Sequence, residues 1–296
     1  MNVETFILDN EKNIRMGFFF GILIIMGIWE TFSPRRKLTI SRPLRWVNNL
    51  SLVFLNSFVV RLLFPLAAVG MAAFVTENGW GLFNYYQIPH TIAIIASIII
   101  MDFIIYLQHV MVHAIPALWR LHRVHHADLD FDVTTGSRFH TLEILLSMLI
   151  KFATIVVLGP PVVAVIIFEV VLNLTAMFNH SNVKIPTSID RVLRWFIVTP
   201  DMHRVHHSVE DDEANSNFGF NLPWWDRLFG TYIDQPRNGH EGMTIGIHKF
   251  RDSKQTAWLP AMLILPFIGK MSGYVINRRV WNEEAKNDKS DQSSTS

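Results

Sequence analysis

The sequence predicts an all-α integral membrane protein, built as a bundle of transmembrane helices. Half of its 296 residues are hydrophobic, including 22 Phe and 9 Trp. The mean hydropathy is +0.26, and these values exceed those of a usual soluble globular domain. The distribution of the apolar residues decides the class, because several runs are long enough to cross a membrane as a helix.

Four long runs are almost free of charge: residues 16–32, 50–75, 88–110 and 141–178. A helix needs about 20 apolar residues to cross the hydrocarbon core of a bilayer. Gly159, Pro160 and Pro161 interrupt the last run, and since proline breaks a helix, this run predicts a helical hairpin. The first run predicts an uncleaved span, because a polar segment precedes it and no small-residue cleavage site follows it.

The positive charges predict the orientation of the spans. A dense cluster of basic residues follows the first run, at Arg35, Arg36, Lys37, Arg42 and Arg45. The positive-inside rule places this loop in the cytoplasm, so the inner ends of the third span and of the hairpin lie on the same side. Arg61, inside the second run, either reaches the interface or pairs within the bundle.

The pentapeptide His-Arg-Val-His-His occurs twice, at residues 122–126 and 203–207, and His109 and His113 precede the first copy. Residues three and four apart lie on one face of a helix. Imidazole is the commonest protein ligand of transition metals. These eight imidazoles are enough for two metal ions. The full prediction is therefore a transmembrane helix bundle with a cytoplasmic, histidine-rich di-metal cap.

Two more histidines complete the set of candidate ligands. His140 begins the first helix of the hairpin and His180 ends the second, so both lie at the same membrane face as the other eight. The ten candidates are His109, His113, His122, His125, His126, His140, His180, His203, His206 and His207. His90, His240 and His248 are interpreted as ordinary core or surface residues.

Several classes of function are disfavoured by the sequence. Cysteine is absent, so any metal site uses nitrogen and oxygen donors. The His-Glu-x-x-His motif of zinc hydrolases and the Gly-x-Gly-x-x-Gly nucleotide fingerprint are absent as well. A balance of 26 basic and 25 acidic residues disfavours nucleic-acid binding. A metal transporter would place its ligands along the interiors of the spans, whereas these clusters lie at the span ends. Imidazole suits iron, copper and zinc, so the choice of metal stays open at this point.

The three histidine clusters in this order resemble the fatty acid hydroxylase/sterol desaturase superfamily of membrane di-iron oxygenases. Residues 138–143, 179–182, 217–219 and 224–232 also resemble the family, and the similarity covers about residues 88–232. One departure is Thr141, where many relatives have proline. The resemblance implies two iron ions, held by the site histidines, that activate O₂ and hydroxylate a C–H bond of a lipid. The alternatives are a lipid or sterol desaturase of the same superfamily and, from a different class, a non-catalytic zinc-binding membrane protein.

The predicted centre also needs supporting residues and partners. Glu143, Asn179 and Asp201 are candidates for the groups around the metal ligands, where a carboxylate typically accepts the second ring N–H of a histidine. The lipid would come from the bilayer, and the electrons from a separate donor protein or a reduced pterin. The acidic run 210–213 is either a docking site for a basic donor or a plain solvated loop. Glu169, deeper in the hairpin, either pairs helices or has a functional role.

The sequence divides into three predicted regions. Residues 1–87 form an N-terminal transmembrane region with two spans, and residues 88–250 form the catalytic domain. Residues 251–296 form an interfacial or re-entrant segment and a polar tail. The apolar stretch 258–271 is short and contains two prolines, which predicts a segment at the membrane interface rather than a full span.

Overall fold

The structure is a computed structural model that describes residues 3–269, and all regular elements in that range are helices. Five segments are long and apolar enough to cross a membrane: Glu11–Phe32, Arg42–Tyr85, His90–Ala114, Thr141–Leu158 and Val162–Asn179. The predicted class, an all-α, multi-pass membrane protein, is confirmed. The placement of its histidine-rich end on the cytoplasmic side stays a prediction.

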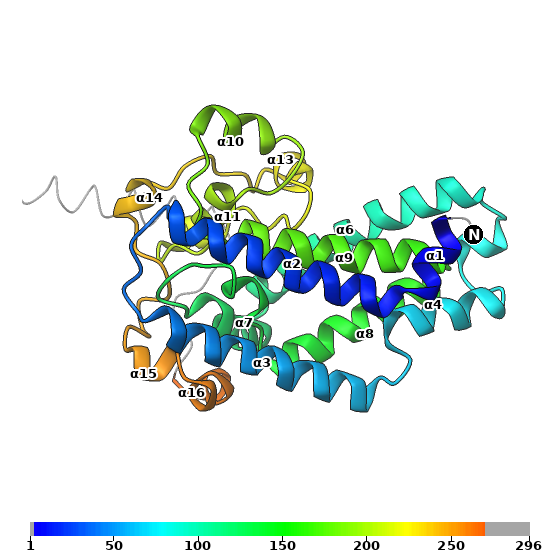
Figure 1. The fold of residues 1–296 in the computed structure, drawn as a ribbon, viewed down its shortest axis with the longest axis horizontal. Coiled ribbons are helices and arrows are strands. Elements are labelled where there is room, and N and C mark those ends of the chain that lie inside the picture. The colour runs from blue at the N-terminus through cyan, green and yellow to red at the C-terminus, as the bar shows by residue number, and fades with distance from the viewer. Residues whose placement is uncertain (1–2, 270–296) are drawn as a thin grey trace, which may run out of the picture.

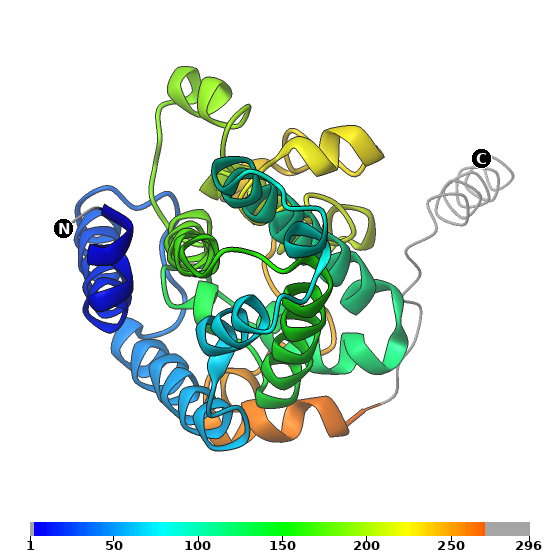
Figure 2. The same cartoon turned by 90° about the vertical axis from the view of Figure 1, so that its right-hand side faces the viewer.

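The bundle consists of α2 (Glu11–Phe32), α3 (Arg42–Leu63), α6 (His90–Ala114), α8 (Thr141–Leu158) and α9 (Val162–Asn179). Figure 1 shows the bundle lengthwise, and Figure 2 shows it end-on. α2 packs against α9, α3 packs against α8, and α6 packs against both α8 and α9. α9 therefore lies between α2 and α6.

The predicted hairpin is formed by α8 and α9. Gly159 follows the last residue of α8 in the left-handed conformation, with φ of 64°, and α9 begins directly after Pro161. A Cβ atom on Gly159 would lie 2.3 Å from the carbonyl oxygen of Trp80. The turn therefore needs glycine both for its backbone conformation and for the close approach of the neighbouring chain.

The second span differs from its prediction. The sequence predicts one helix over residues 50–75, whereas the chain forms α3 and then α4 (Ala67–Glu77). Pro65 lies in the turn between them and explains the break, because proline removes a backbone donor and restricts the residue before it. α3 also begins earlier than predicted, at Arg42. Arg45 therefore lies within this helix, where it is buried, and not in the predicted loop.

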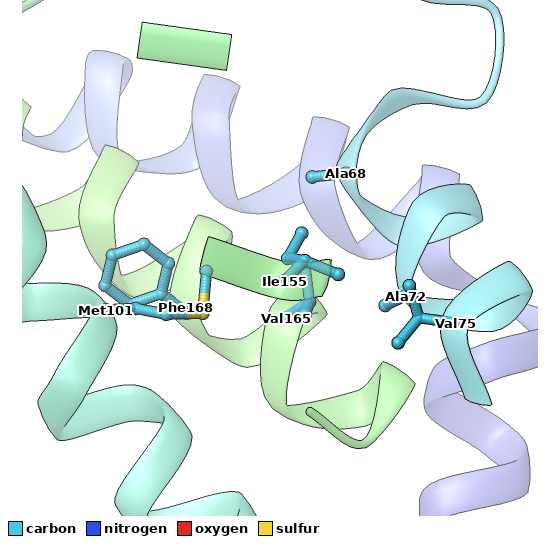
Figure 3. Close-up of a cluster of buried hydrophobic side chains, with 7 residues drawn as sticks. All are labelled: Ala68, Ala72, Val75, Met101, Ile155, Val165 and Phe168. Carbon is cyan, nitrogen blue, oxygen red and sulfur yellow. The ribbon is translucent and has the colours of Figure 1, made fainter. Parts of the chain in front are cut away.

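A hydrophobic core joins α4, α6, α8 and α9 away from the histidines (Figure 3). Its buried side chains are Ala68, Ala72, Val75, Met101, Ile155, Val165 and Phe168. The small residues on α4 let this helix approach the hairpin closely. Close packing of this kind drives the association of helices in a membrane, where water exclusion contributes little.

Shorter helices cover the end of the bundle that carries the histidines (Figure 1). α7 (Pro116–His126) follows α6 directly, and α11 (Pro200–His206) packs against α9. The remaining short elements are α1 (Val3–Asp9), α5 (Leu82–Tyr85), the 3-10 helix η1 (Thr135–Ser137), α10 (Thr187–Leu193), α12 (Asp211–Ala214), α13 (Trp224–Phe229), α14 (Gly239–Gly242) and α15 (Ser253–Thr256).

The apolar stretch near the C-terminus forms α16 (Leu259–Ile264) and the 3-10 helix η2 (Leu265–Phe267). Both are too short to cross a membrane. Arg120 and Arg123 of α7 donate hydrogen bonds to four carbonyl oxygens within residues 265–269, so this stretch is tied to the helix that carries the first pentapeptide. Residues 270 and 271 of the predicted interfacial segment and the predicted polar tail lie outside the described residues.

Candidate metal centre

Nine of the ten candidate histidines meet at one end of the bundle, where they form two groups. The first group is His109, His113, His122, His126 and His206, and the second is His125, His180, His203 and His207. All nine side chains are buried, and within each group the possible ligand atoms lie within 4.8 Å of one another.

Both pentapeptides contribute to both groups. Adjacent residues of an α-helix point about 100° apart, so the neighbours His125 and His126 reach different groups, and so do His206 and His207. The two groups adjoin each other: the ring centroids of His126 and His207 are 4.7 Å apart. A pair of metal ions bound here would therefore share one buried centre.

Backbone carbonyls fix two rings of the first group. The Nδ1 atom of His109 donates to Phe218 O at 2.8 Å, and Nδ1 of His206 donates to Ser216 O at 2.7 Å. A neutral imidazole that donates through one nitrogen presents a lone pair on the other. The Nε2 atoms of both rings are buried and have no hydrogen-bond partner among the described residues. Each ring is thus oriented to offer Nε2 to a cation.

Glu143 fixes a third ring of the first group. Its Oε1 atom accepts a hydrogen bond from Nδ1 of His122 at 2.6 Å, and Nε2 of His122 has no described partner. The Nε2 atoms of His113 and His126 lie only 3.1 Å apart. Several nitrogen lone pairs that converge in a buried space suit a metal ion, because the positive ion can accept all of them as ligands.

The second group centres on His180. Its Nδ1 atom donates to Ala176 O at 2.7 Å, so its Nε2 lone pair faces Nε2 of His125 at 3.0 Å and Nε2 of His203 at 3.1 Å. Burial lowers the pKa of His180 to about 3. Burial and then the neighbouring imidazoles hold the pKa of His203 well below its usual value. Both rings are therefore neutral at physiological pH, the state in which imidazole binds a metal.

The structure places His140 away from both groups. Its Nδ1 atom accepts a hydrogen bond from the backbone N–H of Leu142 at 3.2 Å, and its Nε2 atom lies 3.3 Å from Leu263 O. His140 thus caps the N-terminus of α8. The structure therefore does not bring His140 together with the other nine candidate ligands, because the start of α8 uses its ring for capping. The adjacent Thr141 donates to Asn56 Oδ1 at 2.7 Å.

Of the three predicted supporting residues, only Glu143 has a hydrogen bond to a site histidine. Asn179 is buried and donates a hydrogen bond to Phe220 O at 2.9 Å. It therefore fixes the loop that contains Phe220 and does not orient a candidate ligand histidine. Asp201 pairs with Arg204 and, at 3.2 Å, with Arg35. These contacts tie α11 to the loop after α2, which places the second pentapeptide without contacting its rings.

The spacing of the histidines does not reveal the loop that supplies the carbonyl groups. Asp226 accepts hydrogen bonds from the backbone N–H groups of Phe218 and Gly219 at 2.8 and 2.7 Å, and from Thr231 Oγ1 at 2.7 Å. A Cβ atom on Gly219 would lie 2.6 Å from Asp226 Oδ2, so only glycine fits this contact. Asp226 therefore positions the carbonyl that orients His109.

A buried ion-pair network holds the segment between α7 and α8. Arg45 donates to Asp128 at 3.0 and 2.7 Å and also pairs with Asp132. Burial alone would raise the pKa of Asp128, but the charges of Arg45 and Arg138 outweigh it and lower the pKa to about 2. This network fixes the chain directly after the first pentapeptide.

A cavity of about 320 Å³ opens beside the first group. His109, His122 and Glu143 line its inner end, and it continues between the helices of the bundle as far as Lys151 and Glu169. Its volume lies near the lower limit of usual ligand pockets. A small molecule or part of a larger one would therefore reach the first histidine group from within the bundle.

Residues 94–231 match the family model described as fatty acid hydroxylase. An ornithine lipid hydroxylase of Rhizobium tropici is 26% identical over 227 residues, which are 74% of this chain and 67% of that protein. The chain belongs to the fatty acid hydroxylase/sterol desaturase superfamily. The matched residues of this superfamily member include all nine grouped histidines.

Two further relatives match shorter parts of this superfamily member. An alkylglycerol monooxygenase of Xenopus tropicalis is 30% identical over 152 residues, which are 50% of this chain and 32% of that protein. A fatty acid hydroxylase of a Lecanicillium species is 28% identical over 166 residues, 51% of this chain and 45% of that protein. The matches thus span less than half the length of these two relatives. No solved structure matches the chain.

Proposed function

We propose that this protein is a membrane-bound non-haem di-iron oxygenase that hydroxylates a C–H bond of a lipid. The observation that carries the proposal is the pair of adjoining, buried imidazole groups at the inner end of a cavity within a transmembrane bundle. The matches to hydroxylases and a monooxygenase whose names specify lipids support it. The acyl or alkyl part of a membrane lipid is the proposed substrate.

The nine grouped histidines would hold two iron ions. Iron bound there supplies the oxidation: with O₂, two electrons and two protons, a C–H bond becomes C–OH and the second oxygen atom leaves as water. Glu143 holds His122 in the tautomer whose Nε2 would be free to bind a metal ion. His109 and His122 line the cavity, so its walls would place the reacting carbon beside the first group and exclude bulk water.

We propose that the metal centre faces the cytoplasm, because the basic loop after α2 lies at the same end of the bundle.

The electrons would come from a separate donor protein or a reduced pterin. Glu210 and Asp212 lie 3.7 and 2.5 Å from Arg237. Glu213 accepts a hydrogen bond from the backbone of Arg237. These contacts within the protein favour the plain solvated loop over a donor docking site. The division into domains at residues 87 and 250 stays a prediction.

Oxygen-isotope labelling separates the proposed hydroxylase from a desaturase. Cells that express the protein are grown under ¹⁸O₂, and their lipids are analysed by mass spectrometry. A hydroxylase gives a lipid that carries one ¹⁸O atom and is absent from cells without the protein. A new alkene without label would instead establish the desaturase.

Metal analysis separates the oxygenase from a zinc-binding membrane protein. Protein purified without oxygen from iron-replete cells is expected to contain two iron ions per chain. Zinc alone, together with an unchanged set of cellular lipids, would contradict the proposal. The measurement requires no knowledge of the substrate.

Replacing Glu143 with leucine is expected to weaken metal binding by about 10- to 100-fold, the usual cost of losing a carboxylate that orients a ligand histidine. Leucine leaves Nδ1 of His122 without its acceptor. Glu143→Gln is the matched control, since its amide oxygen can still accept this hydrogen bond, and it should lose much less. Metal content after dialysis against a graded chelator series checks both variants. An equal loss of metal affinity in the two variants would show that the hydrogen bond from His122 to residue 143 does not support metal binding.

A further inference from the structure

The cavity that begins at His109 and His122 ends at a group of charges inside the bundle. Lys151 of α8 lies 2.6 Å from Glu169 Oε1, and Arg15 of α2 lies 3.1 Å from Glu169 Oε2. Lys151, Glu169 and Arg15 all line the cavity. Figures 1 and 2 show α9 running alongside α2. The contacts of Glu169 with Lys151 and Arg15 link α9 to α8 and to α2.

These charges lie within membrane-spanning helices, where ionisable side chains are costly and usually mark a substrate pathway or pair with one another. The side chains of Lys151 and Glu169 are only 12% and 5% exposed, whereas that of Arg15 is 35% exposed. An ion pair that links α8 to α9 would require only Lys151 and Glu169. Such a link explains neither the presence of Arg15 nor the cavity that all three side chains line.

The charged end of the cavity has more hydrogen-bond donors than acceptors. An ammonium group has three N–H donors and a guanidinium has five. Among the described residues, Lys151 donates only to Glu169. Arg15 also pairs with Glu11 at 2.8 Å, but Glu11 does not line the cavity. The two cations and one carboxylate at this end therefore suit a ligand with a negative charge and several acceptor oxygens.

We propose that Lys151 and Arg15 bind the oxyanion end group, a carboxylate or a phosphate, of the lipid substrate. This inference rests on the proposed function. Lys151 follows Glu143 by eight residues in α8, which separates the two by about 12 Å along the helix. The site thus selects the lipid by its end group and sets the oxidised carbon at about this distance from it.

Ligand-dependent thermal stability tests the site without any turnover. The purified full-length protein in detergent is mixed with palmitate, hexadecyl phosphate or hexadecanol, which share one chain length and differ in the end group. At least one anion is expected to raise the Tm more than hexadecanol does, and the anion with the larger effect identifies carboxylate or phosphate as the end group. An equal effect of hexadecanol would overturn the proposal.

Variants of the cations identify the residue responsible. Lys151→Met is expected to lower the affinity for the anion by about tenfold or more, the cost of one charge-assisted hydrogen bond, while Lys151→Arg retains the preference. Arg61→Met is the matched control, because Arg61 is an exposed cation of a transmembrane helix that does not line the cavity. A Lys151→Met protein that still prefers the anion would contradict the assignment. If this variant does not fold, Arg15→Gln removes the second, more exposed cation and should also weaken the preference.

Product analysis distinguishes failure of this inference from failure of the proposed function. If the protein oxidises lipids but Lys151→Met forms the same product at the same carbon and rate, the end-group site is wrong and the oxygenase stands. If no lipid is oxidised but anions stabilise the wild-type protein through Lys151, the binding site stands and the reaction is wrong.

Discussion

Replacing His206 with alanine is expected to lower lipid oxidation by more than about 100-fold, because loss of a direct ligand should exceed the cost of losing a supporting hydrogen bond. His206 is one of five imidazoles in the first group and comes from the second pentapeptide, whereas the other four come from α6 and α7. Its removal therefore takes from the first group the one imidazole that the second pentapeptide contributes to it. We expect the variant to bind less metal as well as to lose activity.

His248→Ala is the control for this substitution, because His248 is exposed and belongs to neither group. Metal content per chain and the cellular lipid profile are measured for both variants and the wild type. A His206→Ala protein with unchanged metal content and an unchanged lipid profile would exclude His206 from the centre.

Replacing Arg45 with leucine is expected to destabilise the protein by about 3–5 kcal/mol, the usual cost of removing one partner of a buried ion pair. The change removes the cation that the buried Asp128 and Asp132 share, and leaves Asp128 with Arg138 at 3.7 Å. Since these residues follow the first pentapeptide, the positions of His125 and His126 should loosen as well. A lowered midpoint of thermal unfolding, with reduced metal content, is the expected measurement.

Arg191→Leu serves as the comparison, because Arg191 is exposed and an exposed charge contributes little to stability. A second variant, Arg45→Leu with Asp128→Asn, should regain part of the lost stability, since it removes one of the two buried negative charges that faced Arg45. If Arg45→Leu unfolds at the same temperature as the wild type, the network does not hold this segment.

Local patterns were sufficient to predict the fold class. The length of the apolar runs identifies the spans, and Gly159-Pro160-Pro161 identifies the hairpin turn, because both depend on residues close together in the chain. Pro65 is a local pattern of the same kind and indicates the break between α3 and α4. The prediction of one helix over residues 50–75 did not take this proline into account and was wrong there. Helical spacing likewise predicted helices at residues 122–126 and 203–207, which α7 and α11 contain.

The sequence by itself determined that the chain is a membrane helix bundle with histidine clusters at the ends of its spans. Only the tertiary structure decided which histidines share a group, that His180 joins them while His140 caps α8, and that carbonyl groups of Ser216 and Phe218 orient two of the rings. It also joined Arg15, Lys151 and Glu169 at one end of the cavity. The physical reason is that hydropathy and helical spacing are local properties. The direction of a ring nitrogen and the pairing of a buried charge depend on contacts between residues far apart in the chain.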